Sequence, residues 1–108
     1  MAGLSEQDFR LKSEEAMEQA RRALMPLADA EGFEIELNHG VLNLLFEEPG
    51  EARFVVSPNA PMRQMWLAAM AKSYKLSWSP GAGAFVLDGE TLTELLDRLT
   101  RTFLSASA

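Results

Sequence analysis

Hydrophobic residues recur at helical spacing in a segment near the start of the chain, roughly Ser5 to Ala30. Ser5 is suited to cap the first turn of this helix. The hydrophobic positions that share one arc are Phe9, Ala16, Met17, Ala20, Ala23, Leu24 and Leu27. Pro26 should either kink the helix or end it early, and Gly32 fits a stop just beyond. The pattern leaves these two roles of Pro26 open.

A second helix is predicted at the other end of the chain. Thr91 and Glu94 form a capping box, in which each side chain accepts a hydrogen bond from the other residue's backbone N–H. The hydrophobic positions that follow are Leu92, Leu95, Leu96, Leu99 and Phe103. Their spacing places them on one face, which indicates a helix that packs against a core.

Between the two helices the hydrophobic period changes to two, which indicates β-strands. The candidate strands are FEIEL (33–37), VLNLLF (41–46), RFVVS (53–57), MRQMWLA (62–68), YKLSW (74–78) and AFVL (84–87). Their short connections predict an antiparallel meander. The sequence therefore predicts an α+β fold in one domain over residues 1–108. It is a two-layer α/β sandwich. In sequence order it runs helix, five- or six-stranded antiparallel meander, helix, and both helices cover one face of the sheet. The other face must then meet solvent or a partner.

The segment PMRQMWLAAM (61–70) predicts which face carries a tryptophan. If Met65 and Leu67 point toward the core, Trp66 points outward. The opposite register would bury Gln64, and burying an amide without partners costs free energy. The outward neighbours expected beside Trp66 are Asn43, Leu45, Val55 and Gln64.

A tryptophan on such a surface is typical of a protein interface, and we predict that this group of side chains binds a partner. The alternative is that Trp66 lies flat on the sheet and shields Leu45 and Val55 from water.

Composition narrows the classes of function. A net charge of -6 over 108 residues argues against a nucleic-acid partner, which requires clustered lysine and arginine. Because the chain has no cysteine and only one histidine, His39, disulfides, thiolate chemistry and the usual zinc sites are excluded. No apolar run approaches the length of a membrane span, so no membrane association is expected. The N-terminal MAGLSEQDF is too acidic and polar for a signal peptide, and a cytoplasmic monomer is expected.

Two groups of carboxylates are candidate metal ligands. Glu14, Glu15 and Glu18 lie on the first helix. Glu34 and Glu36 point outward from the first strand, about 7 Å apart. Such oxygen ligands hold hard cations loosely. The alternative is a solvated surface, on which Glu18 pairs with arginines three and four residues later and Glu34 and Glu36 are simply the polar side of a strand.

Three segments, in this order and spacing, resemble the frataxin family and its bacterial CyaY type: GVLNLLF (40–46), PMRQMWLA (61–68) and DGETLTELL (88–96). The resemblance implies an antiparallel sheet backed by two helices and a role in iron–sulfur cluster assembly. It also implies docking on a cysteine desulfurase and the iron–sulfur scaffold protein, through a sheet face that includes Trp66 and Gln64. Weak iron binding is implied on an acidic ridge along the first helix and first strand. In this chain Arg21 and Arg22 interrupt that ridge.

No motif for catalysis stands out along the chain. SPGAGAF (79–85) contains glycines but precedes a strand and lacks the lysine of a phosphate-binding loop. We therefore expect a non-enzymatic protein that binds iron weakly and acts as an adaptor in iron–sulfur assembly. The alternative is a small acidic adaptor or chaperone domain that uses the same sheet face and has no iron role.

Overall fold

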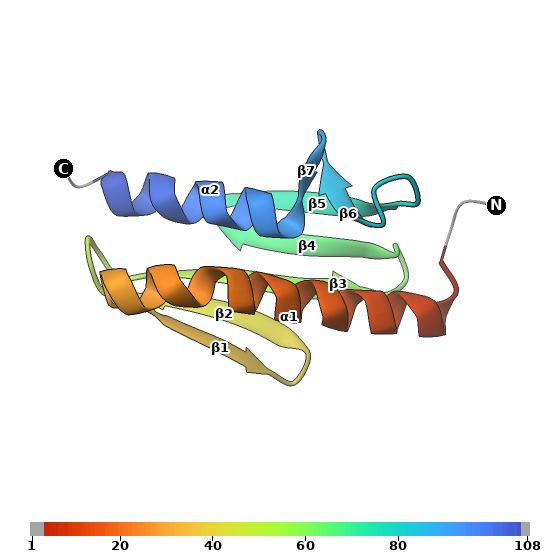
Figure 1. Ribbon diagram of the computed structural model, residues 1–108, viewed down its shortest axis with the longest axis horizontal. Coiled ribbons are helices and arrows are strands. Elements are labelled where there is room, and N and C mark those ends of the chain that lie inside the picture. The colour runs from red at the N-terminus through yellow and green to blue at the C-terminus, as the bar shows by residue number, and fades with distance from the viewer. Residues whose placement is uncertain (1–3, 107–108) are drawn as a thin grey trace.

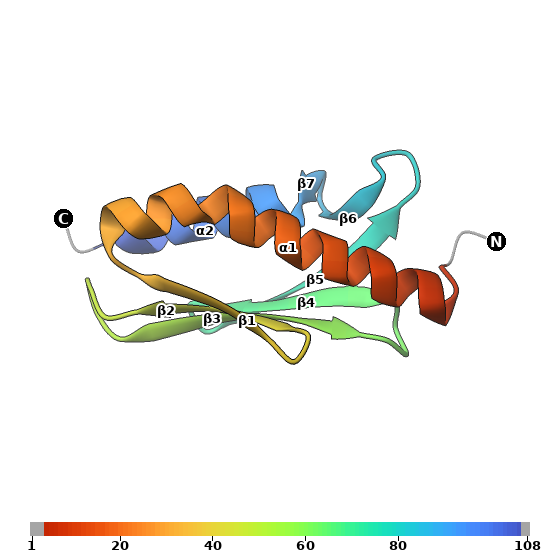
Figure 2. The same ribbon diagram turned by 60° about the horizontal axis from the view of Figure 1, so that its bottom comes forward.

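The computed structural model describes residues 4–106. Helix α1 (Glu6–Glu31) opens the chain and helix α2 (Leu92–Ser105) closes it. Seven strands lie between them: β1 (Glu34–Asn38), β2 (Val41–Phe46), β3 (Ala52–Asn59), β4 (Gln64–Ala69), β5 (Lys72–Ser79), β6 (Ala84–Leu87) and β7 (Glu90–Thr91). They form one antiparallel sheet in the order of the sequence. Both helices cover the same face of this sheet, so the predicted α+β sandwich is confirmed (Figures 1 and 2).

The sheet has one strand more than the five or six predicted. Glu90 and Thr91 pair with Leu87 and Val86 across a tight turn, and a two-residue strand is too short to show a period of two. The fourth strand also begins later than predicted, at Gln64, because Arg63 adopts a φ of 53° in the preceding turn. The cytoplasmic prediction rests partly on the N-terminal segment MAGLSEQDF. Its first three residues, 1–3, lie outside the described residues.

Helix α1 begins and ends as its sequence predicts. The Ser5 side chain accepts a hydrogen bond from the Asp8 N–H at 3.1 Å, and Gly32 closes the helix at a φ of 82°. Pro26 lies inside the helix, so an early end at this residue is excluded. The buried positions of α1 are Phe9, Ser13, Met17, Ala20, Leu24 and Ala28. Ala23 is exposed, contrary to the predicted arc, because it lies one residue, or about 100°, away from the stripe through Ala20 and Leu24.

Helix α2 has the predicted capping box. The Thr91 hydroxyl accepts the Glu94 N–H at 3.2 Å, and the Glu94 carboxylate accepts the Thr91 N–H at 3.0 Å. The Arg98 guanidinium also donates to the Glu90 carboxylate at 2.8 and 2.9 Å, which ties the helix to β7.

One core lies between the helices and the sheet. It includes Leu44, Phe46, Met65, Leu67, Leu92, Leu96 and Leu99. Phe85 packs edge-on against Phe9, with ring centroids 5.6 Å apart, and so joins β6 to α1. Since alternate strand residues point into this core, the intervening residues form the opposite surface of the sheet.

Candidate functional site

Trp66 lies on the sheet surface that faces away from the helices. Its flanking residues Met65 and Leu67 are 0% and 1% exposed, whereas Trp66 is 37% exposed. Trp66 pairs with Ser57 of β3 on one side and with Lys75 of β5 on the other, so it lies in the interior of the sheet and away from its edges. The register predicted from the sequence therefore matches the structure.

The other residues predicted beside Trp66 share this surface. We call the set formed by Asn43, Leu45, Val55, Gln64 and Trp66 the outer sheet face. Asn43 pairs with Val55, and Val55 is two residues from Ser57, which makes it a diagonal neighbour of Trp66. Leu45 lies farther away, opposite Arg53. A role for these residues in binding stays a prediction.

The indole of Trp66 is held in place by polar neighbours. Its Nε1–H donates to the Gln64 side-chain oxygen at 3.0 Å. The Gln64 amide nitrogen in turn donates to the Ser77 hydroxyl at 3.4 Å. The Lys75 ammonium lies 5.0 Å from the centre of the indole, within the range of a cation–π contact. This arrangement limits the motion of a large side chain that is still partly open to solvent.

Sequence reasoning missed Lys75 and Ser77, although a signal was present. In YKLSW the inward position of Leu76 requires both neighbours to point outward. Arg53, opposite Leu45, also belongs beside the outer sheet face. Arg63 does not, because its guanidinium donates to the backbone oxygens of Leu4 and Ala60.

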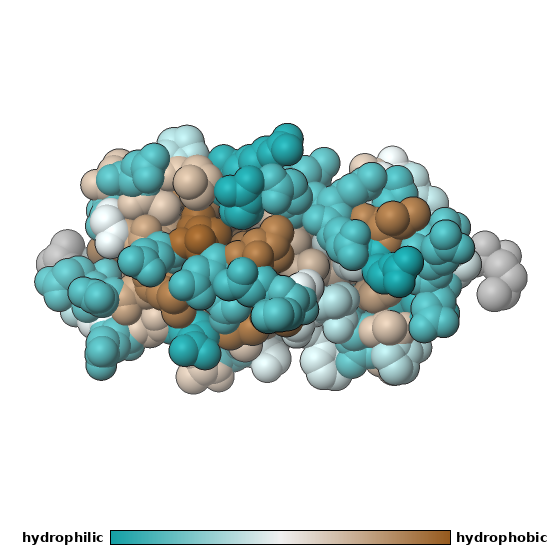
Figure 3. Space-filling model, turned by 90° about the horizontal axis from the view of Figure 1, so that it is seen from below, coloured by the Kyte–Doolittle hydropathy of each residue, from teal (hydrophilic) through white to brown (hydrophobic). Residues whose placement is uncertain are grey.

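The candidate metal-binding carboxylates are divided between two surfaces. Glu14, Glu15 and Glu18 lie on α1, in the helical layer. Glu34 and Glu36 are exposed on the opposite side of the sheet, paired with Leu45 and Asn43. The sheet thus separates the two groups. Viewed from the β1 side, hydrophilic residues surround several exposed hydrophobic ones (Figure 3).

Glu18 is engaged by the two arginines that interrupt the expected ridge. Its carboxylate accepts hydrogen bonds from Arg21 at 2.6 and 3.0 Å and from Arg22 at 2.9 Å. The hydrogen bonds from Arg21 and then Arg22 lower the pKa of Glu18 to about 2, against an ordinary value of 4.5. Binding a metal at Glu18 would require breaking these bonds.

These donors do not fit a closed metal site. Within residues 4–106, no three aspartate, glutamate, histidine or cysteine residues gather closely enough to hold an ion. Glu15 lies 3.6 Å from the Lys12 ammonium, so a second of the five carboxylates has a cation beside it. Any cation would meet separate carboxylates in water.

No helix in the described part of the chain is both long and apolar enough to cross a membrane.

An antiparallel sheet with two helices on one face is the architecture of the frataxin-like class of fold. Comparison with family models supports this directly, since the frataxin-like domain model matches residues 2–106. The chain therefore belongs to the frataxin-like family.

Curated relatives and solved structures are similar to this chain. The iron–sulfur cluster assembly protein CyaY of Azotobacter vinelandii is 33% identical over 69 residues, which cover 62% of this chain and 61% of that protein. The CyaY protein of Pseudomonas putida F1 is 31% identical, with 73% and 74% covered. The structure of a frataxin from Psychromonas ingrahamii aligns with a TM-score of 0.65 at 16% identity and covers 92% of this chain and 90% of that one. At that identity the structural match concerns the fold alone.

Proposed function

We propose that this protein acts in iron–sulfur cluster assembly as an adaptor, and that it docks on a cysteine desulfurase and its scaffold protein through the outer sheet face. The names of the CyaY relatives support a role in iron–sulfur cluster assembly. The partners are those that the family resemblance implies. The adaptor performs no bond chemistry of its own.

The single observation that carries the docking proposal is the partly exposed Trp66, held by Gln64 and Lys75. Tryptophan is enriched among the residues that dominate interface energetics. Docking an aromatic that is already oriented costs less conformational entropy than ordering a mobile one. Trp66 therefore has both the chemistry and the restraint of an interface anchor.

Charges around the outer sheet face give the docking an orientation. Glu34, Leu45 and Arg53 lie in one cross-strand row, with the carboxylate on the edge strand β1 and the guanidinium on β3. Lys75 adds a second positive charge beside Trp66. A partner would place basic groups against the β1 edge and acidic groups near Arg53 and Lys75. Such complementarity favours one relative orientation of the two proteins.

We propose that iron is a weakly held cargo, bound by exposed carboxylates and chiefly by Glu34 and Glu36. Within the described residues neither takes part in an ion pair, unlike Glu15 and Glu18. Single carboxylates in water retain hydration around the ion, so affinity is low and sensitive to salt.

The docking proposal is tested by retention on an immobilised desulfurase–scaffold complex. Wild-type protein should be retained, and Trp66→Ala should lose at least about tenfold in affinity, as expected for a central aromatic. Leu11→Ala is the matched control, because Leu11 is a large hydrophobic residue exposed on α1, away from the outer sheet face. Equal retention of wild type and Trp66→Ala would contradict the proposal.

The same experiment separates the alternative of an acidic adaptor or chaperone outside this pathway. That alternative uses the same face for a different partner. It predicts that wild-type protein fails to bind the desulfurase–scaffold complex at any salt concentration, whereas the proposed function predicts binding that Trp66→Ala weakens.

A further inference from the structure

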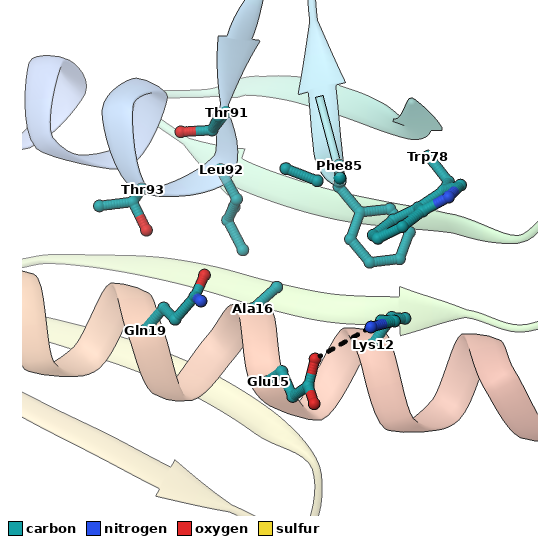
Figure 4. Close-up of a pocket in the computed structure, with 11 residues that line it drawn as sticks. Lys12, Glu15, Ala16, Gln19, Trp78, Phe85, Thr91, Leu92 and Thr93 are labelled. Carbon is teal, nitrogen blue, oxygen red and sulfur yellow. Dashed lines mark ion pairs between the residues drawn. The ribbon is translucent and has the colours of Figure 1, made fainter. Parts of the chain in front are cut away.

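A cavity of about 190 Å³ lies on the helical side of the sheet, on the opposite face from the proposed docking surface. It is bounded by α1, the β5–β6 hairpin and the first turn of α2 (Figure 4). The side chains that determine its chemistry are Lys12, Glu15, Gln19, Trp78, Phe85 and Thr93. Trp78 follows the outward Ser77 on β5 and so points to the helical side.

Two side chains of opposite charge line the cavity and form an ion pair that is too long for a hydrogen bond. The Lys12 ammonium and the Glu15 carboxylate are 3.6 Å apart, which is longer than a hydrogen bond. The same ammonium lies 5.8 Å from the centre of the Trp78 ring. Both charged groups therefore retain hydrogen-bonding capacity for a ligand.

Neutral polar groups face each other across the gap between the helices. The side chains of Gln19 on α1 and Thr93 on α2 point toward one another (Figure 4). An amide and a hydroxyl in this arrangement offer both donors and acceptors to a bound molecule.

The floor of the cavity is aromatic and already formed. Trp78 packs edge-on against Phe85 with ring centroids 5.2 Å apart, and Phe85 is itself fixed by its contact with Phe9. Because Phe85 is buried, an apolar group that enters the cavity meets a rigid wall and not a mobile side chain.

The volume limits the ligand to a small molecule. A space of 190 Å³ equals the liquid volume of roughly six waters at ~30 Å³ each. Since organic groups pack more densely than water, roughly eight to ten non-hydrogen atoms fill it. A free amino acid of this size matches the cavity.

We propose that this cavity binds a small zwitterion, an α-amino acid with an apolar side chain. Its ammonium group contacts Glu15, its carboxylate contacts Lys12, and its side chain lies against Trp78. A ligand with one charge would pair with only one of Lys12 and Glu15 and would lack the second charge contact, which lowers its affinity. This site is separate from the outer sheet face and does not depend on the proposed function.

The test is an NMR titration of the full chain with L-leucine. The chain has two tryptophans, so two indole N–H signals report on the two surfaces, and Trp66→Phe assigns them. The Trp78 signal should shift on addition of leucine up to about 20 mM, which saturates a site of ~1 mM affinity, while the Trp66 signal stays in place. No shift at Trp78, or equal shifts at both signals, would overturn the proposal.

Two analogues test the requirement for both charges. Isoamylamine is leucine without its carboxylate, and 4-methylpentanoate is leucine without its amine. Each should bind at least about threefold more weakly than leucine, the scale of one partly exposed charge contact. An analogue that binds as well as leucine would show that the cavity recognises only one of the two charges. That result would contradict the proposed zwitterion.

Variants assign the two charges to their residues. Lys12→Gln and Glu15→Gln should each weaken leucine binding by roughly threefold to fivefold. The two substitutions should also shift the preference between the two analogues, one in the opposite direction to the other. Glu14→Gln is the matched control, because Glu14 neighbours Glu15 but does not line the cavity. If Glu14→Gln weakens leucine binding as much as Glu15→Gln, the assignment fails.

Discussion

The Trp66 indole donates a hydrogen bond to the Gln64 side chain at 3.0 Å, between two residues that are two positions apart on β4. Residues at this spacing always share a face of a strand. Gln64 also reaches Ser77 on the neighbouring strand, so the indole is anchored to β5 as well as to β4. A partner would meet an aromatic side chain whose orientation is largely set in advance.

Trp66→Ala should destabilise the fold only modestly, by about 1–2 kcal/mol. Deletion of a fully buried aromatic costs about 3–5 kcal/mol, but Trp66 is partly exposed, and in its absence the Gln64 side chain can hydrogen-bond to water. Chemical denaturation followed by circular dichroism measures the difference in the free energy of unfolding.

Met65→Ala provides the comparison for this measurement. Met65 is the adjacent residue but is fully buried, so its truncation should cost about 2–5 kcal/mol. If Trp66→Ala proves as damaging as Met65→Ala, Trp66 is chiefly a structural residue, and a loss of binding in that variant would no longer indicate an interface.

Gln64→Ala should weaken docking less than Trp66→Ala does. It removes the acceptor that orients the indole but leaves the aromatic surface in place, and a net hydrogen bond contributes about 0.5–1.5 kcal/mol, or roughly twofold to tenfold in affinity. Surface plasmon resonance on the immobilised desulfurase–scaffold complex compares the affinities of the two variants.

Ser77→Ala refines the interpretation of Gln64. The Ser77 hydroxyl accepts a hydrogen bond from Gln64, whereas the indole N–H donates to Gln64 itself, so removal of Ser77 should have a smaller effect than Gln64→Ala. A Gln64→Ala variant that binds like the wild type would mean that orientation of the indole contributes nothing to docking.

The face of Trp66 could be predicted because it depends on one strand alone. Lys75 could not be placed over the indole in the same way, because that contact depends on the register between β4 and β5. Register in a hairpin is set by its turn, and this turn uses Met70 and Ala71 at φ of 52° and 65°. Neither residue type signals a turn with positive φ, so the sequence carried no local mark of the register.

The carboxylates illustrate a different limit of sequence reasoning. The pairing of Glu18 with Arg21 and Arg22 follows from helical spacing and was weighed as an alternative to metal binding. The cavity beside Lys12 was not anticipated, because it arises where α1, the β5–β6 hairpin and α2 meet. Contacts between segments so distant in sequence depend on the tertiary packing, for which no local pattern exists.

Iron binding should be weak and should fade as salt rises. Increasing ionic strength from about 0.1 M to about 1 M shortens the Debye length from ~10 Å to ~3 Å, which screens exposed carboxylates. Titration with Fe²⁺, followed by broadening of backbone amide signals along β1, measures this. Tight stoichiometric binding at the higher salt would contradict it.

Substitution of two carboxylates localises the iron. Glu34→Gln combined with Glu36→Gln should remove most of the broadening along β1, because it neutralises both exposed carboxylates of that strand. Glu90→Gln is a suitable control, since Glu90 forms an ion pair with Arg98 and lies on the opposite edge strand. Unchanged broadening in the double variant would place the iron elsewhere.

The ion pairs of Glu18 should make stability depend on pH in the acid range. The pKa of Glu18 is about 2 in the folded protein, below its ordinary value of 4.5. A carboxylate with a lowered pKa stabilises the fold above its unfolded pKa, and this contribution is lost as pH falls through the folded pKa. The stability difference between wild type and Glu18→Gln should therefore be largest above pH 4.5 and should shrink toward pH 2.

Thermal melts of both proteins across this pH range give that difference, and a second pair of variants tests its cause. In a background of Arg21→Gln with Arg22→Gln, both hydrogen-bonding partners of Glu18 are gone. Glu18→Gln in that background should produce a much smaller change with pH, because the interaction that lowers the pKa is absent. A difference between wild type and Glu18→Gln that stays constant from pH 6 to about pH 2 would show that the arginines do not favour the charged carboxylate. It would also remove the reason for excluding Glu18 as a free metal ligand.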